Sequence, residues 1–157
     1  MRIGHGYDVH RFVAGDHVML GGVKIAHDRA VEAHSDGDVL LHALCDALLG
    51  AAALGDIGRH FPDHAQQFKS IDSRILLRRT GELLAQHGYR LINADLTLIA
   101  QTPKVSGYTQ AMCKNIAADL AVDVGAISVK ATTTEKLGFV GEKKGIAAEA
   151  VVLIDDK

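Results

Sequence analysis

Two polar side chains near the start of the chain combine residue types that bind metal ions. Asp8 and His10 flank Val9 in a stretch that alternates as a β-strand does. Residues two apart in a strand point to the same side, so the carboxylate and the imidazole are expected to face a common point. Each is an ordinary zinc ligand, and a catalytic zinc needs one more protein ligand and one open position. Taken alone, this spacing fits a chance surface pair better than a metal site.

His42 is the third candidate ligand, within a run that is apolar nearly all round and predicts a buried helix. A buried imidazole must have a polar partner. Asp38 and Asp46 lie four residues to either side, so we expect one of them to accept its second N–H. A core histidine satisfied in this way is the simpler interpretation, but with Asp8 and His10 available we favour a zinc site. Its open position can polarise a phosphoryl or carbonyl oxygen or activate water.

Three further segments carry residue types that suit phosphate groups. Residues 34–36 precede the apolar helix, where the helix dipole and free N–H groups favour an anion and His34 can add a donor. Loop 55–63 has two glycines that let the backbone approach a ligand. Residues 130–136 hold three threonines and Glu135, a carboxylate that suits Mg²⁺ or Mn²⁺ beside phosphates. An ordinary loop, a turn and the strand preference of threonine also explain these segments, except for Glu135.

The periodicity predicts the elements that must position these groups. Apolar alternation or continuous apolar runs predict strands, and wider apolar spacing predicts helices. The expected strands are 2–13, 89–100, 127–133 and 146–154, with a short hairpin turning near 14–16 and 21–22. The expected helices are 39–54 with Ser35 as N-cap, a second from Asp72 or Ser73 to before Gly88, and 107–121 capped by Ser106. Three or four long strands and three helices predict one layered domain over residues 1–157.

The composition narrows the function classes. The chain has 157 residues and a formal net charge of -2, which gives no electrostatic case for nucleic acid or an anionic membrane. The longest apolar stretch is too short to cross a bilayer. Cys45 and Cys113 have no paired spacing and indicate reduced thiols in a cytoplasmic protein. No Walker loop, dinucleotide fingerprint or nucleophile elbow is present, which argues against an ATPase, a dinucleotide enzyme and an α/β-hydrolase.

Several motifs in register resemble the 2-C-methyl-D-erythritol 2,4-cyclodiphosphate synthase family, and the resemblance spans essentially the whole chain. They are Gly4-His5-Gly6-Tyr7-Asp8-Val9-His10, Ala33-His34-Ser35-Asp36-Gly37-Asp38-Val39, residues 51–60, Ile99-Ala100-Gln101-Thr102-Pro103-Lys104, 130–138 and 145–150. The resemblance implies a lyase of non-mevalonate isoprenoid biosynthesis. It implies that the 2-phosphate of 4-diphosphocytidyl-2-C-methyl-D-erythritol 2-phosphate attacks the β-phosphorus and expels CMP.

The resemblance also implies roles for individual residues. Asp8, His10 and His42 would hold zinc, Glu135 would hold Mg²⁺ or Mn²⁺, and His34 and Thr133 would stabilise the transition state. The implied substrate contacts are Ser35, Asp56, Ile57, Gly58, Phe61, Asp63 and Phe139, and the implied cytidine pocket is Ala100, Pro103, Lys104, Val105 and Ser106 with Thr132.

The fold implied by the resemblance is α+β, a mixed four-stranded sheet with helices packed on one face. Three such chains would form a homotrimer whose active sites lie between adjacent subunits. Two other functions stay open at this point. A zinc phosphohydrolase would use metal-bound hydroxide on a phosphate ester. A binding protein without activity would close its metal site with a fourth protein ligand.

Overall fold

A mixed β-sheet forms one layer of the molecule. The computed structural model describes residues 1–62 and 70–157. Its largest sheet has five strands in the order β4-β1-β7-β5-β6, in which β5 and β6 are parallel and the other pairs are antiparallel. These strands are β1 (Arg2–Ala14), β4 (Arg29–Val31), β5 (Tyr89–Ile99), β6 (Ile127–Thr132) and β7 (Gly145–Asp156). The architecture is therefore α+β, as expected.

The expectation of four strands was wrong by one. The four long strands are present, but β4 adds a fifth through pairing of Val31 with Phe12 and of Arg29 with Ala14. Three residues are too few for an alternating pattern, so sequence periodicity could not detect this edge strand. The expected hairpin is confirmed as a separate two-stranded sheet, β2 (His17–Leu20) and β3 (Val23–Ala26). Gly21 and Gly22 make its turn with φ of 56° and 73°, a region that favours glycine.

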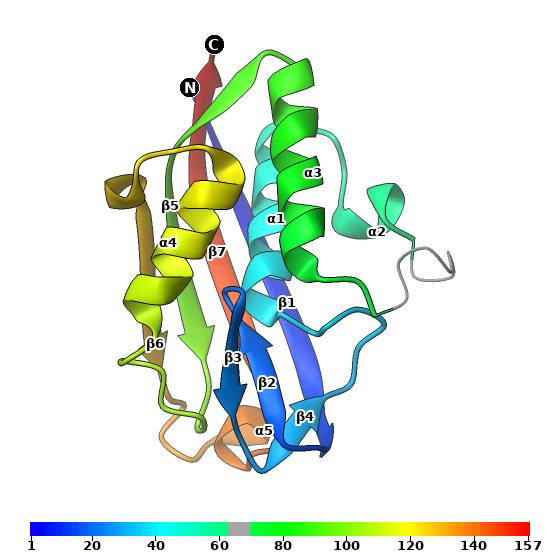
Figure 1. Ribbon diagram of the computed structural model, residues 1–157, viewed down its shortest axis with the longest axis vertical. Coiled ribbons are helices and arrows are strands. Elements are labelled where there is room, and N and C mark those ends of the chain that lie inside the picture. The colour runs from blue at the N-terminus through cyan, green and yellow to red at the C-terminus, as the bar shows by residue number, and fades with distance from the viewer. Residues whose placement is uncertain (63–69) are drawn as a thin grey trace.

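The helices cover one face of the sheet (Figure 1). α1 packs on β1 and β7, α3 packs on α1 and α4, and α4 packs on β6. Their bounds are α1 (Val39–Ala51), α3 (Ser73–Gln86) and α4 (Thr109–Leu120). The described residues also form the short helices α2 (Ile57–His60), η2 (Val124–Ala126) and α5 (Gly138–Gly141). Within the described ranges, no helix is long and apolar enough to cross a membrane.

The helix caps differ in part from the predicted ones. Asp38, not Ser35, is the N-cap of α1, and its carboxylate accepts from the Leu41 N–H. α4 has Tyr108 at its N-cap position without a side-chain hydrogen bond, so the predicted cap by Ser106 was wrong. The predicted start of α3 is confirmed, with Asp72 as N-cap. In each wrong case a suitable polar residue was available, but the chain turned into the helix a few residues later.

Close contact between β1 and α1 determines how near the candidate metal ligands Asp8 and His10 lie to His42. An added Cβ at Gly4 would lie 2.0 Å from the Ala47 carbonyl oxygen, and one at Gly6 would lie 2.0 Å from the Ala43 carbonyl oxygen. The two glycines therefore let the helix backbone rest directly on the strand. Asp8 follows on the same side of β1, so its carboxylate reaches the same interface between strand and helix.

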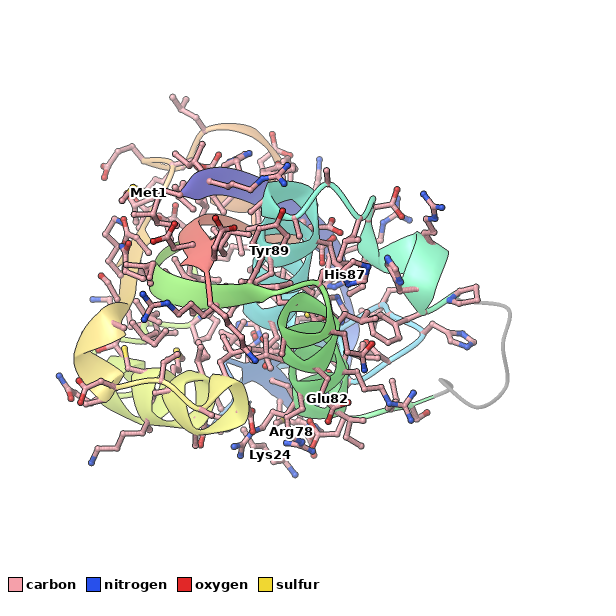
Figure 2. The ribbon with its side chains drawn as sticks, turned by 90° about the horizontal axis from the view of Figure 1, so that it is seen from above. Met1, Lys24, Arg78, Glu82, His87 and Tyr89 are labelled. Atoms are coloured by element: carbon pink, nitrogen blue, oxygen red, sulfur yellow. The ribbon has the colours of Figure 1, made fainter. Side chains whose placement is uncertain are left out.

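The opposite face of the sheet is exposed and partly apolar. Ile3, Tyr7 and Val9 of β1 and Val151 of β7 are 73%, 50%, 39% and 40% exposed. We call these four side chains the outer face. At the end of the sheet nearest the termini, the Arg2 guanidinium donates to the Tyr89 hydroxyl at 2.8 Å, and Met1 and Tyr89 are both seen there from above (Figure 2).

Candidate metal centre and phosphate site

Asp8, His10 and His42 meet at one point between β1 and α1. The Asp8 Oδ2, His10 Nε2 and His42 Nδ1 atoms form a triangle in which each side measures 3.1 Å. The other Asp8 oxygen, Oδ1, accepts from the Val9 N–H at 2.9 Å. Strand alternation places the first two side chains together, and the glycine contact brings α1 close enough for His42 to join them.

The triangle fits a tetrahedral cation better than a set of hydrogen bonds. A zinc ion with bonds of about 2.0–2.1 Å holds its ligands roughly 3.3 Å apart. Each imidazole nitrogen of His10 or His42 carries at most one proton, so the three mutual contacts cannot all be hydrogen bonds. One contact would oppose two lone pairs or two protons, whereas a cation attracts all three atoms. In the part of the chain that the structure describes, this is the group of metal-type side chains that could hold an ion.

The electrostatics of the triangle favour positive charge. Burial raises the pKa of Asp8, but its contacts with His10 and His42 outweigh burial and leave that pKa well below the usual range. Burial lowers the pKa of His42, and the contact with and charge of Asp8 reverse this, so the net shift is upward. The Asp8 carboxylate therefore stays ionised and can bind a cation at neutral pH.

A pocket of about 340 Å³ opens beside the triangle. Besides the three metal-type residues, its walls include several predicted site residues: His34, Ser35, Asp46, Ile57, Gly58 and Phe61. Glu32, Ala33, Ile71 and Leu76 complete the lining and were not predicted from the sequence. A space of this size with imidazole, hydroxyl and carboxylate groups on one side suits a small polar ligand.

Asp46 lines this pocket, and Asp56 lies outside its lining but caps the helix that carries Ile57 and Gly58. The Asp46 carboxylate accepts from the Ile57 N–H at 2.7 Å, which ties α2 to α1. Asp56 is the N-cap of α2 and accepts from the Arg59 N–H at 2.9 Å. Burial raises the pKa of Asp46. The predicted role of Asp46 as a partner of His42 was wrong, because its oxygen faces the α2 backbone.

Asp38 does not contact the His42 ring either. Its oxygens accept from the Gly21, Gly22 and Leu41 N–H groups at 2.9, 2.7 and 3.2 Å. An N-cap side chain turns back over the helix start, so the i, i+4 spacing no longer places it beside His42. Asp38 instead holds the β2–β3 turn against α1.

Two serines contact the His42 ring. His42 Nε2 lies 2.9 Å from the Ser73 hydroxyl and 3.1 Å from the Ser35 hydroxyl. Asp36 contacts Ser73 in turn, at 2.5 Å between its Oδ1 and the hydroxyl oxygen. Ser73 was not predicted as a partner of His42, because it lies 31 residues from His42 and starts a different helix. Its position at the predicted start of the second helix was the only feature of the sequence near Ser73 that could have drawn attention to it.

A second group of predicted residues gathers where β6 ends. The Thr133 hydroxyl donates to the Glu135 carboxylate at 3.0 Å, and the Ala100 N–H donates to the Thr132 carbonyl at 3.0 Å. Glu135 and Lys136 have φ of 52° and 67°, a left-handed conformation that is unusual for such residues and clusters at functional sites. The predicted cation ligand and the predicted cytidine loop are therefore neighbours.

The loop after β5 presents both side chains and backbone. Lys104 and Ser106 are exposed and Pro103 is half-buried, so their side chains are accessible. Ala100 and Val105 are 7% and 2% exposed, so contact with a base would have to use their backbone atoms. Phe139 lies in α5 and lines a different hollow, beside Val9 and Glu142. The predicted contact Asp63 lies outside the described residues.

The two groups stand apart within one chain. The triangle lies on β1, and Glu135 follows β6, with β7 and β5 between these strands in the sheet. Three strand spacings of about 4.8 Å give a separation of roughly 14 Å across the sheet. Asp8 and Glu135 therefore do not share a pocket in this chain.

Known proteins of one family match this chain over nearly its whole length. The model of the YgbB family matches residues 1–155. A 2-C-methyl-D-erythritol 2,4-cyclodiphosphate synthase of Thioalkalivibrio sulfidiphilus (strain HL-EbGR7) is 64% identical over 155 residues, which cover 99% of this chain and 97% of that protein.

Solved structures of related proteins have the same fold as this chain. The IspF of Plasmodium falciparum, in a CDP complex, has a TM-score of 0.87 and 42% identity, covering 99% of this chain and 96% of that one. The bifunctional IspDF of Campylobacter jejuni has a TM-score of 0.96 and 46% identity. The match covers 99% of this chain but 42% of that longer protein.

Proposed function

This chain belongs to the YgbB family, and we propose that it is the enzyme that converts 4-diphosphocytidyl-2-C-methyl-D-erythritol 2-phosphate into 2-C-methyl-D-erythritol 2,4-cyclodiphosphate and CMP. The observation that carries this proposal is that Asp8, His10 and His42, which could hold a metal ion, line the same pocket as His34 and Ser35, which can donate to phosphate. The chain that carries this pocket is 64% identical to a named synthase. The whole chain, residues 1–157, would form its single catalytic domain, and the reaction belongs to non-mevalonate isoprenoid biosynthesis.

The reaction needs alignment more than it needs a covalent partner from the protein. An oxygen of the 2-phosphate forms a bond to the β-phosphorus, and the bond from that phosphorus to the bridging oxygen of CMP breaks. The electron pair leaves with CMP, so no water enters the product. Such phosphoryl transfers depend on positioning and on neutralising phosphate charge.

The residues of the pocket supply these functions. Asp8, His10 and His42 would hold Zn²⁺, which when bound supplies Lewis-acid stabilisation of a phosphoryl oxygen. His34 and Ser35 line the pocket beside them and would donate to phosphate oxygens as charge develops. Ile57, Gly58 and Phe61 would pack along the methylerythritol part, with Asp56 and Asp63 as polar contacts.

The residues that follow β5 and β6 would bind the nucleotide end. Glu135 offers carboxylate oxygens of the kind that Mg²⁺ or Mn²⁺ prefers, and we assign it that ion. Thr133 would donate to phosphate in the transition state, and Phe139 would complete the substrate contacts from α5. The cytidine contacts proposed are Ala100, Pro103, Lys104, Val105, Ser106 and Thr132.

One chain does not bring the two halves of this site together, which supports assembly as a homotrimer. The outer face exposes Ile3, Tyr7, Val9 and Val151, which a monomer would leave in water. We infer that three copies bury this face and that Glu135 of one copy completes the pocket of the next. The free, buried Cys45 and Cys113 suit a reducing compartment, and we assign the cytoplasm.

Product analysis tests the proposal directly. The purified chain, supplied with the substrate, Zn²⁺ and Mg²⁺ in ¹⁸O-labelled water, is expected to release CMP and a cyclic diphosphate that both lack the label. A zinc phosphohydrolase would use metal-bound hydroxide, so one of its products would carry ¹⁸O. Labelled product, or no CMP release at all, would overturn the assignment. Metal analysis of the same preparation checks that zinc is bound.

A further inference from the structure

The His42 ring has one nitrogen for the triangle and one for the start of α3. We propose that Asp36, acting through Ser73, keeps the His42 proton on Nε2 and thereby leaves Nδ1 open for the metal ion. Asp36 and Ser73 are positioning residues in this account, since neither belongs to the triangle. The inference rests on the proposed function and deepens it, because it explains how the chain prepares one ligand of the proposed zinc.

The contacts form one continuous line from the triangle to Asp36. His42 Nδ1 lies 3.1 Å from Asp8 Oδ2, and His42 Nε2 lies 2.9 Å from Ser73 Oγ. Ser73 Oγ then lies 2.5 Å from Asp36 Oδ1, within the range of a hydroxyl that donates to a carboxylate. Ser73 is fully buried, so water does not compete for its hydroxyl.

Donor and acceptor counting decides where each proton lies. An ionised carboxylate only accepts, so the Ser73 hydroxyl must donate its single proton to Asp36. Ser73 Oγ then has only lone pairs to offer His42. The 2.9 Å contact is therefore a hydrogen bond only if His42 Nε2 carries the proton. A neutral imidazole protonated at Nε2 has its lone pair on Nδ1, the atom in the triangle.

The surrounding backbone holds Asp36 in its accepting role. Its Oδ1 also accepts from the Asp38 N–H at 3.2 Å, and its Oδ2 accepts from the Ser73 N–H at 3.1 Å. The Asp36 N–H donates to the Ile71 carbonyl at 3.1 Å, which joins the segment before α1 to the segment before α3. Both carboxylate oxygens of Asp36 therefore face donors, and Oδ1 is the carboxylate oxygen that lies closest to the Ser73 hydroxyl within residues 1–62 and 70–157.

Ser35 leaves this assignment unchanged. Its hydroxyl oxygen lies 3.1 Å from His42 Nε2 and accepts from the Gly37 N–H at 3.2 Å. No carboxylate fixes its proton, so Ser35 can share the Nε2 proton of His42 and turn its own proton toward the pocket. That proton is then available to a phosphate oxygen, which agrees with the substrate contact proposed for Ser35.

The tautomer of His42 is the first test. Long-range ¹H–¹⁵N correlation spectra of the ¹⁵N-histidine-labelled full chain report which ring nitrogen is protonated, and a His42→Gln variant assigns the signal. We expect the Nε2 proton both in the zinc-loaded protein and after zinc has been removed by a chelator. A neutral His42 ring that carries its proton on Nδ1 and not on Nε2 in the zinc-free protein would overturn the inference, whatever the activity.

The second test changes Asp36 without touching His42. In Asp36→Asn the amide can donate to Ser73, which frees the serine proton for His42 Nε2 and favours the wrong tautomer. We expect zinc affinity, measured by competition with a chromophoric chelator, to fall about 10- to 100-fold, as for other partners of metal-bound histidines. Ser73→Ala is expected to lose affinity similarly, and Ser73→Thr, which keeps the hydroxyl, to regain part of it.

A matched variant separates this effect from damage to α3. Asp72→Asn alters the N-cap of the same helix, where the carboxylate accepts from the Arg74 N–H, and does not contact His42. We expect it to keep wild-type zinc affinity and the Nε2 tautomer. Equal zinc affinity in Asp36→Asn and the wild type would overturn the inference and leave the proposed function standing. A wild-type chain that binds no zinc and releases no CMP would instead remove the proposed function.

Discussion

At the scale of the residue, the two nitrogens of His42 have different neighbours. Nδ1 faces Asp8 and His10, and Nε2 faces two hydroxyls. This asymmetry distinguishes a candidate ligand from a core histidine that is merely satisfied by one aspartate. The carboxylates expected to support His42 serve the backbone instead, and Ser73 takes their place. Because the two proposed metal ions have different ligands, substitution of a single ligand should abolish the effect of one ion and leave the other bound.

His42→Ala and Glu135→Gln are expected to fail in different ways. His42→Ala removes one of three zinc ligands, so we expect loss of bound zinc and a fall in CMP release of at least about 100-fold. Glu135→Gln keeps the triangle, so zinc content should stay at the wild-type level while the response to added Mg²⁺ or Mn²⁺ is lost. Metal analysis and CMP-release assays measure both effects. His17→Ala, which removes a ring that contacts Asp16 in the β2–β3 hairpin, is the control. Full zinc content in His42→Ala would contradict the ligand assignment.

At the scale of the element, contact between β1 and α1 determines where the triangle forms. Two glycines on one side of β1 bring the strand and helix backbones together. Asp8 and His10 continue that side of the strand, so the spacing between strand and helix sets their distance from His42. The start of α1 is held separately, by the Asp38 carboxylate and the β2–β3 turn.

We expect Gly6→Ala to damage both the fold and the metal site. The added Cβ would lie 2.0 Å from the Ala43 carbonyl oxygen, so strand and helix must separate. Overpacking of this kind destabilises proteins by about 1–3 kcal/mol. Denaturant unfolding and zinc competition should therefore both show a loss. Gly50→Ala is the matched control, because its added Cβ meets no described atom within 4 Å beyond its chain neighbours and its own helix backbone, and alanine favours a helix. Equal stability of Gly6→Ala and Gly50→Ala would contradict the proposed contact.

Asp38→Ala is expected to destabilise the protein without removing a metal ligand. The change leaves three backbone N–H groups, those of Leu41, Gly21 and Gly22, without their acceptor. Loss of a cap and of buried hydrogen bonds together costs about 3 kcal/mol. That corresponds to a fall of roughly 10 °C in Tm for a chain of this length, measured by calorimetry. Asp123→Ala, which removes an exposed cap, should cost less than about 1 kcal/mol.

At the scale of the whole molecule, the sheet order separates the two halves of the proposed site. β1 carries the triangle near one edge, and β6 ends beside Glu135 at the other. The outer face of β1 and β7 exposes apolar side chains on the side opposite α1, α3 and α4. Both features suit an assembly in which each copy completes the site of its neighbour.

Complementation between inactive variants would test this assembly. When equal amounts of His42→Ala and Glu135→Gln subunits are mixed and reassembled, some interfaces pair an intact triangle with an intact Glu135. A site is intact only when a Glu135→Gln subunit supplies the triangle and a His42→Ala subunit supplies Glu135. Each condition is met in about half of the cases, so we expect about one quarter of the wild-type CMP release. Each variant reassembled alone should stay inactive. Absence of any recovery, in mixtures shown by native mass spectrometry to contain both subunits, would exclude shared sites.

The four long strands, the three main helices and the three residues of the triangle could be predicted from the order of the amino acids. Periods of two and of about 3.6 residues report which side of an element a residue occupies, because they follow from backbone geometry alone. The spacing of Asp8 and His10 in a predicted strand was therefore enough to place them side by side. The apolar surroundings of His42 likewise indicated burial and a need for a polar partner.

The groups that contact His42 could not be predicted, because they come from distant parts of the chain. Ser73 reaches His42 from another helix, Asp36 reaches Ser73 across two loops, and β4 pairs through three residues. The distance between the triangle and Glu135 likewise follows from the strand order. Local periodicity assigns a residue to a face, but packing decides which distant residue meets that face, since many sequence-remote partners satisfy the same local pattern.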